Sequence, residues 1–242
     1  MRYLILALCL INVQISKCNN NTDMIAENNT TDNTVLQYLV RAPKVQLEKK
    51  KAIILLHGVG SNEKDLFGIA NMLPDDLYVI APRGQFALGG DRYAWYQVDF
   101  STGKPIYNLA QEASSRKLLS TFIDQIKEKY QLQEVYVGGF SQGAIMSYSL
   151  GLTNPTSVKG ILALSGRILE EVRPLVIKND ELKQLKVFVA HGVSDNVLPV
   201  GYARESKQYL SQLEVPLTYH EYELGHSISE KVIQDINTWL AN

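Results

Sequence analysis

From residue 35 onward, short continuous runs of apolar residues alternate with longer segments in which apolar residues recur every three or four positions. The run 52–56 is apolar throughout, as is typical of a strand covered on both faces of a sheet. Segment 111–130 instead has the spacing of an amphipathic helix. Its predicted buried face consists of Leu119, Phe122, Ile123, Ile126 and Tyr130.

This pattern predicts a regular succession of strands and helices. Strands are expected over 35–41, 52–56, 77–80, 135–137, 159–165, 186–190 and 217–222, and helices over 64–72, 111–130, 144–152, 201–213 and 229–240. Strands that alternate with helices indicate an α/β fold with a doubly wound, mostly parallel sheet. Without a repeat or a break in composition, residues 35–242 are predicted to form one domain, with no insertion large enough for a lid.

The N-terminus has a different character. Arg2 precedes an apolar run over 4–13, which fits a secretory signal peptide ending near residue 18 and is too short to span a membrane. A buried strand or helix is the alternative. Because Cys18 follows Ile-Ser-Lys in a loose lipobox, a lipid anchor there is a further possibility. We expect an Asn/Thr-rich disordered spacer over 19–34 and a secreted or envelope location.

Composition excludes several classes of function. The chain has 242 residues, 45% of them hydrophobic and 20% charged, and a formal net charge of −1, so it offers no basic surface for nucleic acid. Its two cysteines, Cys9 and Cys18, both lie within or at the edge of the predicted signal. We therefore expect no disulfide or thiol site in the domain. The histidines lack paired ligand spacing such as H-x-x-x-H, and neither a metal nor a cofactor is expected.

The sequence Gly139-Phe140-Ser141-Gln142-Gly143 stands between a predicted strand and a predicted helix. G-x-S-x-G in this position describes a nucleophile elbow, a sharp turn that raises the serine hydroxyl above the sheet. Side chains at the two glycines would collide with the neighbouring backbone. A structural serine in a tight turn is the alternative for Ser141.

A serine nucleophile requires a base and a carboxylate that orients it, in this fold in the chain order serine, acid, histidine. Asp195 follows the 186–190 strand and His226 follows the 217–222 strand, so both fit the order. Asp195 is alternatively a turn or capping residue, whereas Asp180 precedes its strand and faces the wrong edge. The other histidines are less suitable: His57 and His191 fail the order, and His220 lies within a strand.

The oxyanion hole is predicted from two backbone N–H groups. One belongs to Gln142, the residue after the nucleophile, and the other to Val59, in the His57-Gly58-Val59 loop that follows the 52–56 strand. The aromatic-rich loop 84–108 is long enough to be functional. We expect Trp95 in this loop to contact substrate, and packing of the loop is the alternative role.

Several motifs together resemble the phospholipase/carboxylesterase family of α/β-hydrolases, which includes acyl-protein thioesterases and small carboxylesterases. They are Leu56-His57-Gly58-Val59-Gly60, Ala81-Pro82-Arg83-Gly84, Arg92-Tyr93-Ala94-Trp95-Tyr96, Gly139-Phe140-Ser141-Gln142-Gly143, His191-Gly192-Val193-Ser194-Asp195 with Val197-Leu198-Pro199, and Gly225-His226. The resemblance implies a Ser141, Asp195 and His226 triad with Val59 and Gln142 as oxyanion donors. The predicted signal peptide is a difference from the cytosolic members of this family.

The function expected from the sequence is hydrolysis of small or linear acyl esters by a serine carboxylesterase that forms an acyl-enzyme. A secreted hydrolase of polysaccharide-linked esters, of feruloyl or acetyl type, is one alternative. A binding protein that uses the same scaffold without catalysis is another, and a serine peptidase is disfavoured because no additional domain restricts the site. Acyl length and oligomeric state are left open.

Overall fold

A computed structural model describes residues 33–45, 48–99, 101 and 105–242. The predicted signal peptide and all but the last two residues of the predicted spacer lie outside the described residues. Asn33 and Thr34, which end that spacer, adjoin the domain: the carbonyl of Asn33 accepts a hydrogen bond of 3.2 Å from Gln125.

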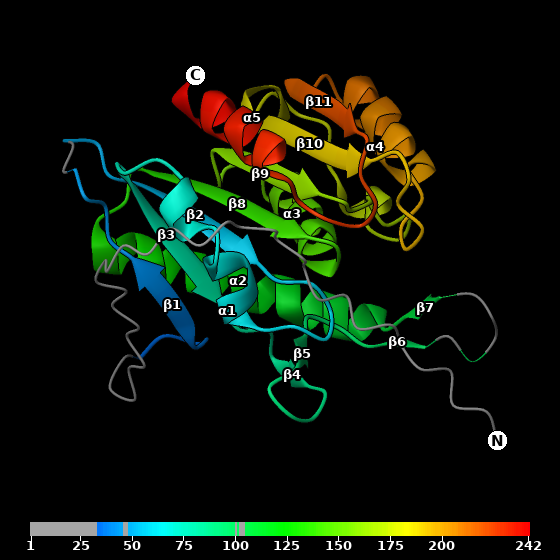
Figure 1. Cartoon of the computed structure of the whole chain (residues 1–242), viewed down its shortest axis with the longest axis horizontal. Coiled ribbons are helices and arrows are strands. Elements are labelled where there is room, and N and C mark those ends of the chain that lie inside the picture. Colours follow the sequence, from blue (N-terminus) through cyan, green and yellow to red (C-terminus); the bar gives the residue numbers. More distant parts are fainter. Residues whose placement is uncertain (1–32, 46–47, 100, 102–104) are drawn as a thin grey trace.

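The centre of the domain is a seven-stranded sheet with the order β1-β3-β2-β8-β9-β10-β11, and only β1 is antiparallel to its neighbour (Figure 1). This is the predicted doubly wound, mostly parallel sheet. Two short hairpins, β4–β5 and β6–β7, lie outside it. The strands are β1 Tyr38–Arg41, β2 Lys51–Leu56, β3 Leu77–Pro82, β4 Phe86–Ala87, β5 Tyr93–Ala94, β6 Val98–Asp99, β7 Ile106–Tyr107, β8 Glu134–Phe140, β9 Gly160–Leu164, β10 Lys186–Gly192 and β11 Leu217–Tyr222.

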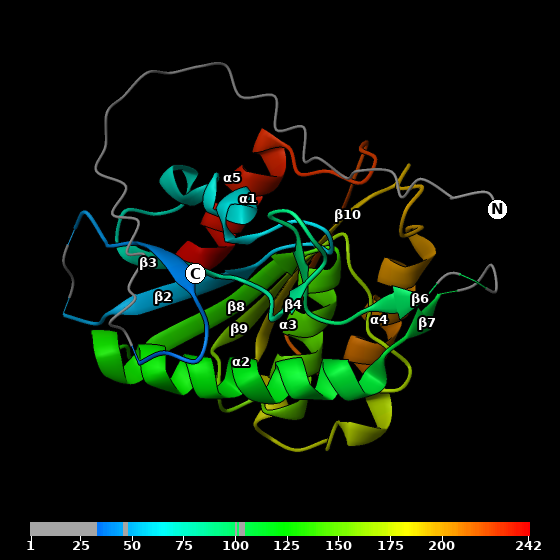
Figure 2. The same cartoon turned by 90° about the horizontal axis from the view of Figure 1, so that it is seen from below.

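Helices cover both faces of the sheet. In Figure 2, α1 and α5 lie on one side of the strands and α2, α3 and α4 on the other. Alternate residues of strand β2 pack on opposite faces of the sheet. Ile54 lies in the core beneath α2 and α3, whereas Ile53 and Leu55 lie in the core beneath α1 and α5. The helices are α1 Glu63–Phe67, α2 Leu109–Tyr130, α3 Gln142–Thr153, α4 Gly201–Gln212 and α5 Glu230–Ala241.

The predicted strands and long helices are confirmed with small shifts at their ends, but two segments differ. The helix expected over 64–72 stops at Phe67 and continues after Gly68 only as a 3₁₀ turn over Ala70–Met72. The loop expected over 84–108 contains the two hairpins. Their strands are two residues long, too short for periodicity to reveal them.

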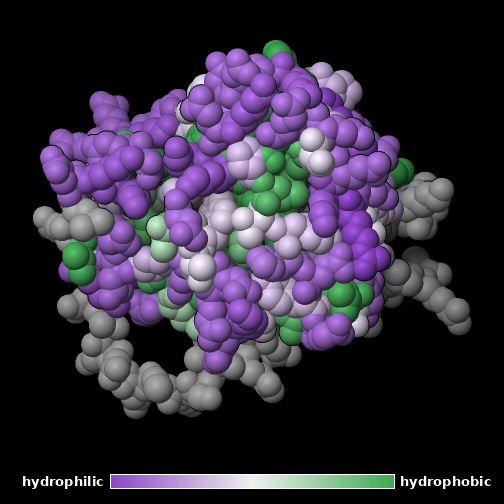
Figure 3. Space-filling view, turned by 90° about the horizontal axis from the view of Figure 1, so that it is seen from above, coloured by the Kyte–Doolittle hydropathy of each residue, from purple (hydrophilic) through white to green (hydrophobic). Residues whose placement is uncertain are grey.

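One face of the molecule is mainly hydrophilic and carries only small apolar patches (Figure 3). None of the helices in the described part of the chain combines the length and the apolar character that crossing a bilayer requires.

Candidate active site

The turn between β8 and α3 has the geometry of a nucleophile elbow. Ser141 has φ 56° and ψ −117°, a left-handed conformation that is strained for a residue with a side chain. Its N–H donates to the carbonyl of Leu164 at 2.9 Å, which ties the turn to the end of β9. Ser141 is thus held at the carboxyl edge of the sheet and remains partly exposed.

Gly143 allows α3 to begin directly above the end of β2. A Cβ atom at Gly143 would meet the carbonyl oxygen of Leu56 and would lie 2.8 Å from that of His57. We expect Gly143→Ala to lower the free energy of unfolding by about 3 kcal/mol, because backbone on both sides must move. Gly201→Ala is the matched control, since a Cβ there has open space. Urea denaturation measures both, and equal stability of the two variants would contradict the steric explanation.

Asp195 and His226 meet beyond the ends of β10 and β11. The Nδ1 atom of His226 lies 2.7 Å from Oδ2 of Asp195, and both side chains are buried, at 4% and 0% exposure. The other carboxylate oxygen, Oδ1, accepts hydrogen bonds from the N–H groups of Val197 at 2.9 Å and Leu198 at 2.8 Å. The carboxylate is therefore fixed in orientation, and it holds the Nδ1 proton of His226.

His191 is a second histidine beside the same carboxylate. Its Nε2 lies 2.6 Å from the carbonyl oxygen of Leu198 and 3.4 Å from Oδ2 of Asp195. Burial alone would raise the pKa of Asp195, but hydrogen bonds from His191, His226 and Leu198 outweigh it and hold that pKa well below its usual range. Asp195 is consequently ionised at neutral pH.

The second ring nitrogen of His226 makes no hydrogen bond to the described residues. This nitrogen, Nε2, is buried. The imidazole packs against Phe140, the residue before Ser141, with 4.6 Å between ring centroids. The Asp195–His226 pair therefore lies against the residue that precedes Ser141, with the Nε2 atom of His226 unpartnered among the described residues.

The loop after β2 runs beside Ser141. A Cβ atom on Gly58 would lie only 3.5 Å from Cβ of Ser141, so this backbone passes close to the serine. Val59 N–H has no acceptor within the described residues. Gln142 N–H belongs to the first turn of α3, where N–H groups have no partner inside the helix. Among the described residues, neither of the two predicted oxyanion donors is engaged in a backbone hydrogen bond, and the loop that carries Val59 passes close to Ser141.

Trp95 has a different place from the one predicted. Instead of facing substrate, its side chain is fully buried, with 0% exposure, and its indole Nε1–H donates to the carbonyl of His57 at 2.9 Å. Its backbone is bound to the side chain of Gln142, whose Oε1 accepts from Trp95 N–H at 2.8 Å and whose Nε2 donates to Tyr96 at 2.7 Å. Trp95 therefore fixes the loop His57-Gly58-Val59, called the oxyanion loop below after the donor predicted in it, to the elbow, in line with the packing alternative.

His57, excluded as a base by chain order, is fully buried beneath the oxyanion loop. Burial is the main cause that lowers its pKa from 6.5 to about 4, and the nearby Arg83 charge acts in the same direction. The ring is therefore neutral at pH 7, and within the domain it contacts backbone groups of Gly58 and Gly84.

The depressed pKa of His57 predicts acid sensitivity. The unfolded chain binds a proton at His57 near pH 6.5, whereas the folded chain stays neutral down to about pH 4. The free energy of unfolding should therefore fall by about 3 kcal/mol as the pH is lowered through this window. Urea denaturation between pH 7 and 4.5 measures the slope, and His57→Asn should flatten it. Equal slopes for the two proteins would contradict the prediction.

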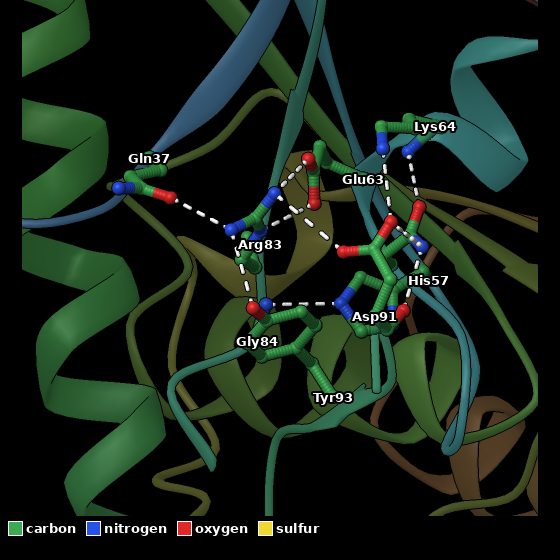
Figure 4. Close-up of polar contacts among 9 residues, drawn as sticks. Gln37, His57, Glu63, Lys64, Arg83, Gly84, Asp91 and Tyr93 are labelled. Atoms are coloured by element: carbon green, nitrogen blue, oxygen red, sulfur yellow. Dashed lines mark hydrogen bonds and ion pairs between the residues drawn. The ribbon is translucent and has the colours of Figure 1, made fainter. Parts of the chain in front are cut away.

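An ion pair supports the far end of the oxyanion loop. Arg83, directly after β3, donates to both carboxylate oxygens of Glu63, the first residue of α1, at 2.7 and 2.5 Å. Its other nitrogen donates to Gln37 at 2.8 Å and to the Tyr93 hydroxyl at 3.2 Å. Figure 4 shows the guanidinium between these partners. Burial would raise the pKa of Glu63, but the Arg83 hydrogen bonds keep it below its usual value.

A groove with a volume of about 670 Å³ begins at the oxyanion loop. It runs between the two hairpins outside the main sheet, and most of its lining is apolar. The lining residues are Val59, Leu88, Ala94, Gln97, Val98, Asp99, Ile106, Tyr107 and Asn108. Within the described residues, no cluster of three or more His, Cys, Asp or Glu side chains is placed to hold a metal ion.

Residues 40–242 match the sequence profile of the phospholipase/carboxylesterase family. The chain belongs to this family. Among curated relatives, acyl-protein thioesterase 1 of Mycosarcoma maydis is 28% identical over 232 residues, which cover 86% of this chain and 97% of the relative. Lysophospholipase-like protein 1 of Mus musculus is 26% identical over 208 residues, 78% of this chain and 85% of the relative.

Solved structures of carboxylesterases and esterases have the same fold as this chain. The carboxylesterase of Bacillus cereus superposes with a TM-score of 0.74 at 22% identity, covering 86% of this chain and 95% of that one. Esterase PE8 superposes with a TM-score of 0.73 at 26% identity, covering 85% and 98%. The α/β-hydrolase fold predicted from the sequence is thereby confirmed, and the chain is a hydrolase-family protein of the esterase and thioesterase group.

The structure also contains supporting residues that the sequence did not reveal. The side chain of Gln142, the ring of His57 and the imidazole of His191 all hold backbone near the site. For the two histidines the sequence does contain an indication, because each of them precedes a glycine at the end of a strand. Nothing in the sequence indicates the role of the Gln142 side chain, since its partners lie more than 45 residues away along the chain.

Proposed function

We propose that this protein is a serine carboxylester hydrolase that acts through an acyl-enzyme on small or linear acyl esters. The observation that carries the proposal is the buried Asp195–His226 pair, joined at 2.7 Å, with the unpartnered Nε2 of His226 beside the strained Ser141 turn. Family membership supports hydrolysis of this kind.

In the proposed reaction, Nε2 of His226 takes the Ser141 hydroxyl proton as Oγ bonds to the ester carbonyl carbon. The carbonyl oxygen becomes an oxyanion that accepts hydrogen bonds from Val59 N–H and Gln142 N–H, each contributing about 3 kcal/mol to transition-state stabilisation. Collapse of the tetrahedral intermediate breaks the bond to the alcohol, which leaves with the proton from His226. Water then repeats the sequence and releases the acid.

The groove beside Val59 supports the substrate class. Its apolar lining suits an acyl chain, and its polar groups, Gln97, Asp99 and Asn108, are few. Because most of the lining is apolar, the groove offers few hydrogen-bonding partners to a polysaccharide. We therefore favour simple acyl esters over the feruloyl and acetyl-polysaccharide alternatives.

Thioester hydrolysis is the second candidate function. It is favoured by the relative from Mycosarcoma maydis, which is an acyl-protein thioesterase. The same triad and oxyanion donors serve both reactions, because both pass through a tetrahedral oxyanion and an acyl-serine.

A matched substrate panel tests the proposal. p-Nitrophenyl esters with acyl chains of two to twelve carbons should be hydrolysed with saturation kinetics, and kcat/KM should peak within the series because the groove has a finite length. Thioesters with the same acyl chains compare the two candidate functions directly. Absence of turnover on every ester and thioester, in folded protein that binds the same acyl chains, would support the binding-protein alternative instead.

A further inference from the structure

His57 contacts the peptide unit that carries the proposed oxyanion donor. Its Nδ1 atom lies 2.7 Å from the carbonyl oxygen of Gly58. That carbonyl and the N–H of Val59 belong to the same planar trans peptide, in which C=O and N–H point in opposite directions. A donor that holds the Gly58 carbonyl on one side therefore fixes the direction of Val59 N–H on the other side. The same backbone passes close to Ser141, because a Cβ atom on Gly58 would lie 3.5 Å from Cβ of Ser141.

The second ring nitrogen determines which tautomer His57 adopts. Gly84 N–H donates to Nε2 at 2.9 Å (Figure 4), so Nε2 has a lone pair and no proton. A neutral imidazole has a single proton, which must then be on Nδ1, the nitrogen facing the Gly58 carbonyl. Gly84 thus selects the tautomer that can hold the oxyanion peptide.

The ring is anchored on all sides. It is fully buried, its own backbone carbonyl accepts the Trp95 indole N–H at 2.9 Å, and the two rings are in contact at 5.3 Å between centroids. Gly84 can approach only because it has no side chain: a Cβ there would lie 2.7 Å from the Ala94 carbonyl oxygen and 3.2 Å from His57 Nε2. The ion pair of Arg83, next to Gly84, fixes this strand end to α1.

Ser61 N–H also donates to the Gly58 carbonyl, but at the longer distance of 3.3 Å. This turn contact closes the loop locally, whereas the shorter His57 contact ties it to the core. Loss of the His57 donor would leave the peptide held only by the longer Ser61 contact, so that its orientation would be less well defined.

We propose that His57 is a positioning residue: its Nδ1–H, selected by Gly84 N–H, orients the Gly58–Val59 peptide so that Val59 N–H faces the tetrahedral oxyanion. This proposal rests on the proposed esterase function and assigns His57 no proton transfer. Since the contact is present before substrate binds, its effect is to preorganise the oxyanion hole.

Three substitutions of His57 distinguish the contributions of its two ring nitrogens to activity. Asparagine places an amide N–H near the position of Nδ1, whereas glutamine places its polar group near Nε2 and leucine has neither. We expect His57→Gln and His57→Leu to lower kcat by about 10- to 100-fold with little change in KM, and His57→Asn to remain within about threefold of the unaltered enzyme. His220→Asn, on an exposed strand residue, is the control.

Affinity for a transition-state analogue distinguishes positioning from loss of structure. An alkyl boronic acid forms a tetrahedral adduct with a serine hydroxyl, and its affinity should fall in proportion to kcat in the Gln and Leu variants. Affinity for the matched unreactive amide should stay unchanged. Unchanged kcat in both variants, or lowered kcat with undiminished boronate affinity, would overturn the proposal.

The unaltered protein offers a measurement that does not depend on how the variants fold. Long-range ¹H–¹⁵N spectra at pH 7 should show His57 neutral with its proton on Nδ1, and protonation on Nε2 would overturn the proposal. Ser141→Ala separates this inference from the function itself. If that variant is inactive while His57→Gln is fully active, only the positioning role fails; if Ser141→Ala is active, the proposed function fails.

Discussion

Replacement of Ser141 by alanine is expected to lower kcat for a chromogenic acyl ester by about 10⁴- to 10⁶-fold. Without Oγ no acyl-enzyme can form, and the remaining rate depends on water attack assisted by Val59 and Gln142 N–H. Alanine adopts the strained backbone at position 141 with the same difficulty as serine, and Oγ has no intramolecular partner among the described residues. Thermal unfolding should therefore be nearly unchanged.

Ser211→Ala is the matched control, because Ser211 is an exposed serine on α4. Kinetics of the purified variants on one ester, with circular dichroism to confirm the fold, decide the result. A folded Ser141→Ala variant within tenfold of the unaltered rate would contradict the assignment of the nucleophile.

The second large effect is expected for Asp195→Asn, which should reduce kcat by about 10⁴-fold. The Oδ1 position must remain an oxygen, because it accepts the N–H groups of Val197 and Leu198. The amide nitrogen then faces Nδ1 of His226 and donates to it. His226 is forced to carry its proton on Nε2, and it can no longer accept one from Ser141.

A flipped amide does not rescue this variant, since its NH₂ group would then face the two backbone N–H donors. Asp180→Asn is the control, because Asp180 is an exposed carboxylate, with a side-chain exposure of 90%, that pairs only with Lys183 among the described residues. A pH–rate profile accompanies the kinetics, and activity of Asp195→Asn equal to that of the Asp180 variant would contradict the assigned acid.

The framework of the domain could be predicted because its signals are local. Runs such as 52–56 are apolar on both faces, which periodicity reveals directly, and the structure places them as β2 between two helical layers. The positions of Ser141, Asp195 and His226 followed from chain order and strand ends. In a parallel sheet those ends share one edge, so three distant residues could be placed together.

Other features could not be read from the sequence because they depend on contacts between distant segments. Trp95 was expected at the substrate because an aromatic residue in a long loop has no pattern that separates burial from exposure. Its partner, the His57 carbonyl, lies 38 residues earlier. The break at Gly68 similarly overrode a continuous helical pattern. Export, and a lipid at Cys18, concern residues outside the described part of the chain and stay predictions.

The most direct test of the central claim is covalent labelling of the full domain with a fluorophosphonate, followed by peptide mapping. One adduct per chain is expected, on the peptide that contains Ser141, with ester hydrolysis lost in proportion to labelling. An adduct on another serine, or full hydrolysis by a completely labelled protein, would contradict the claim.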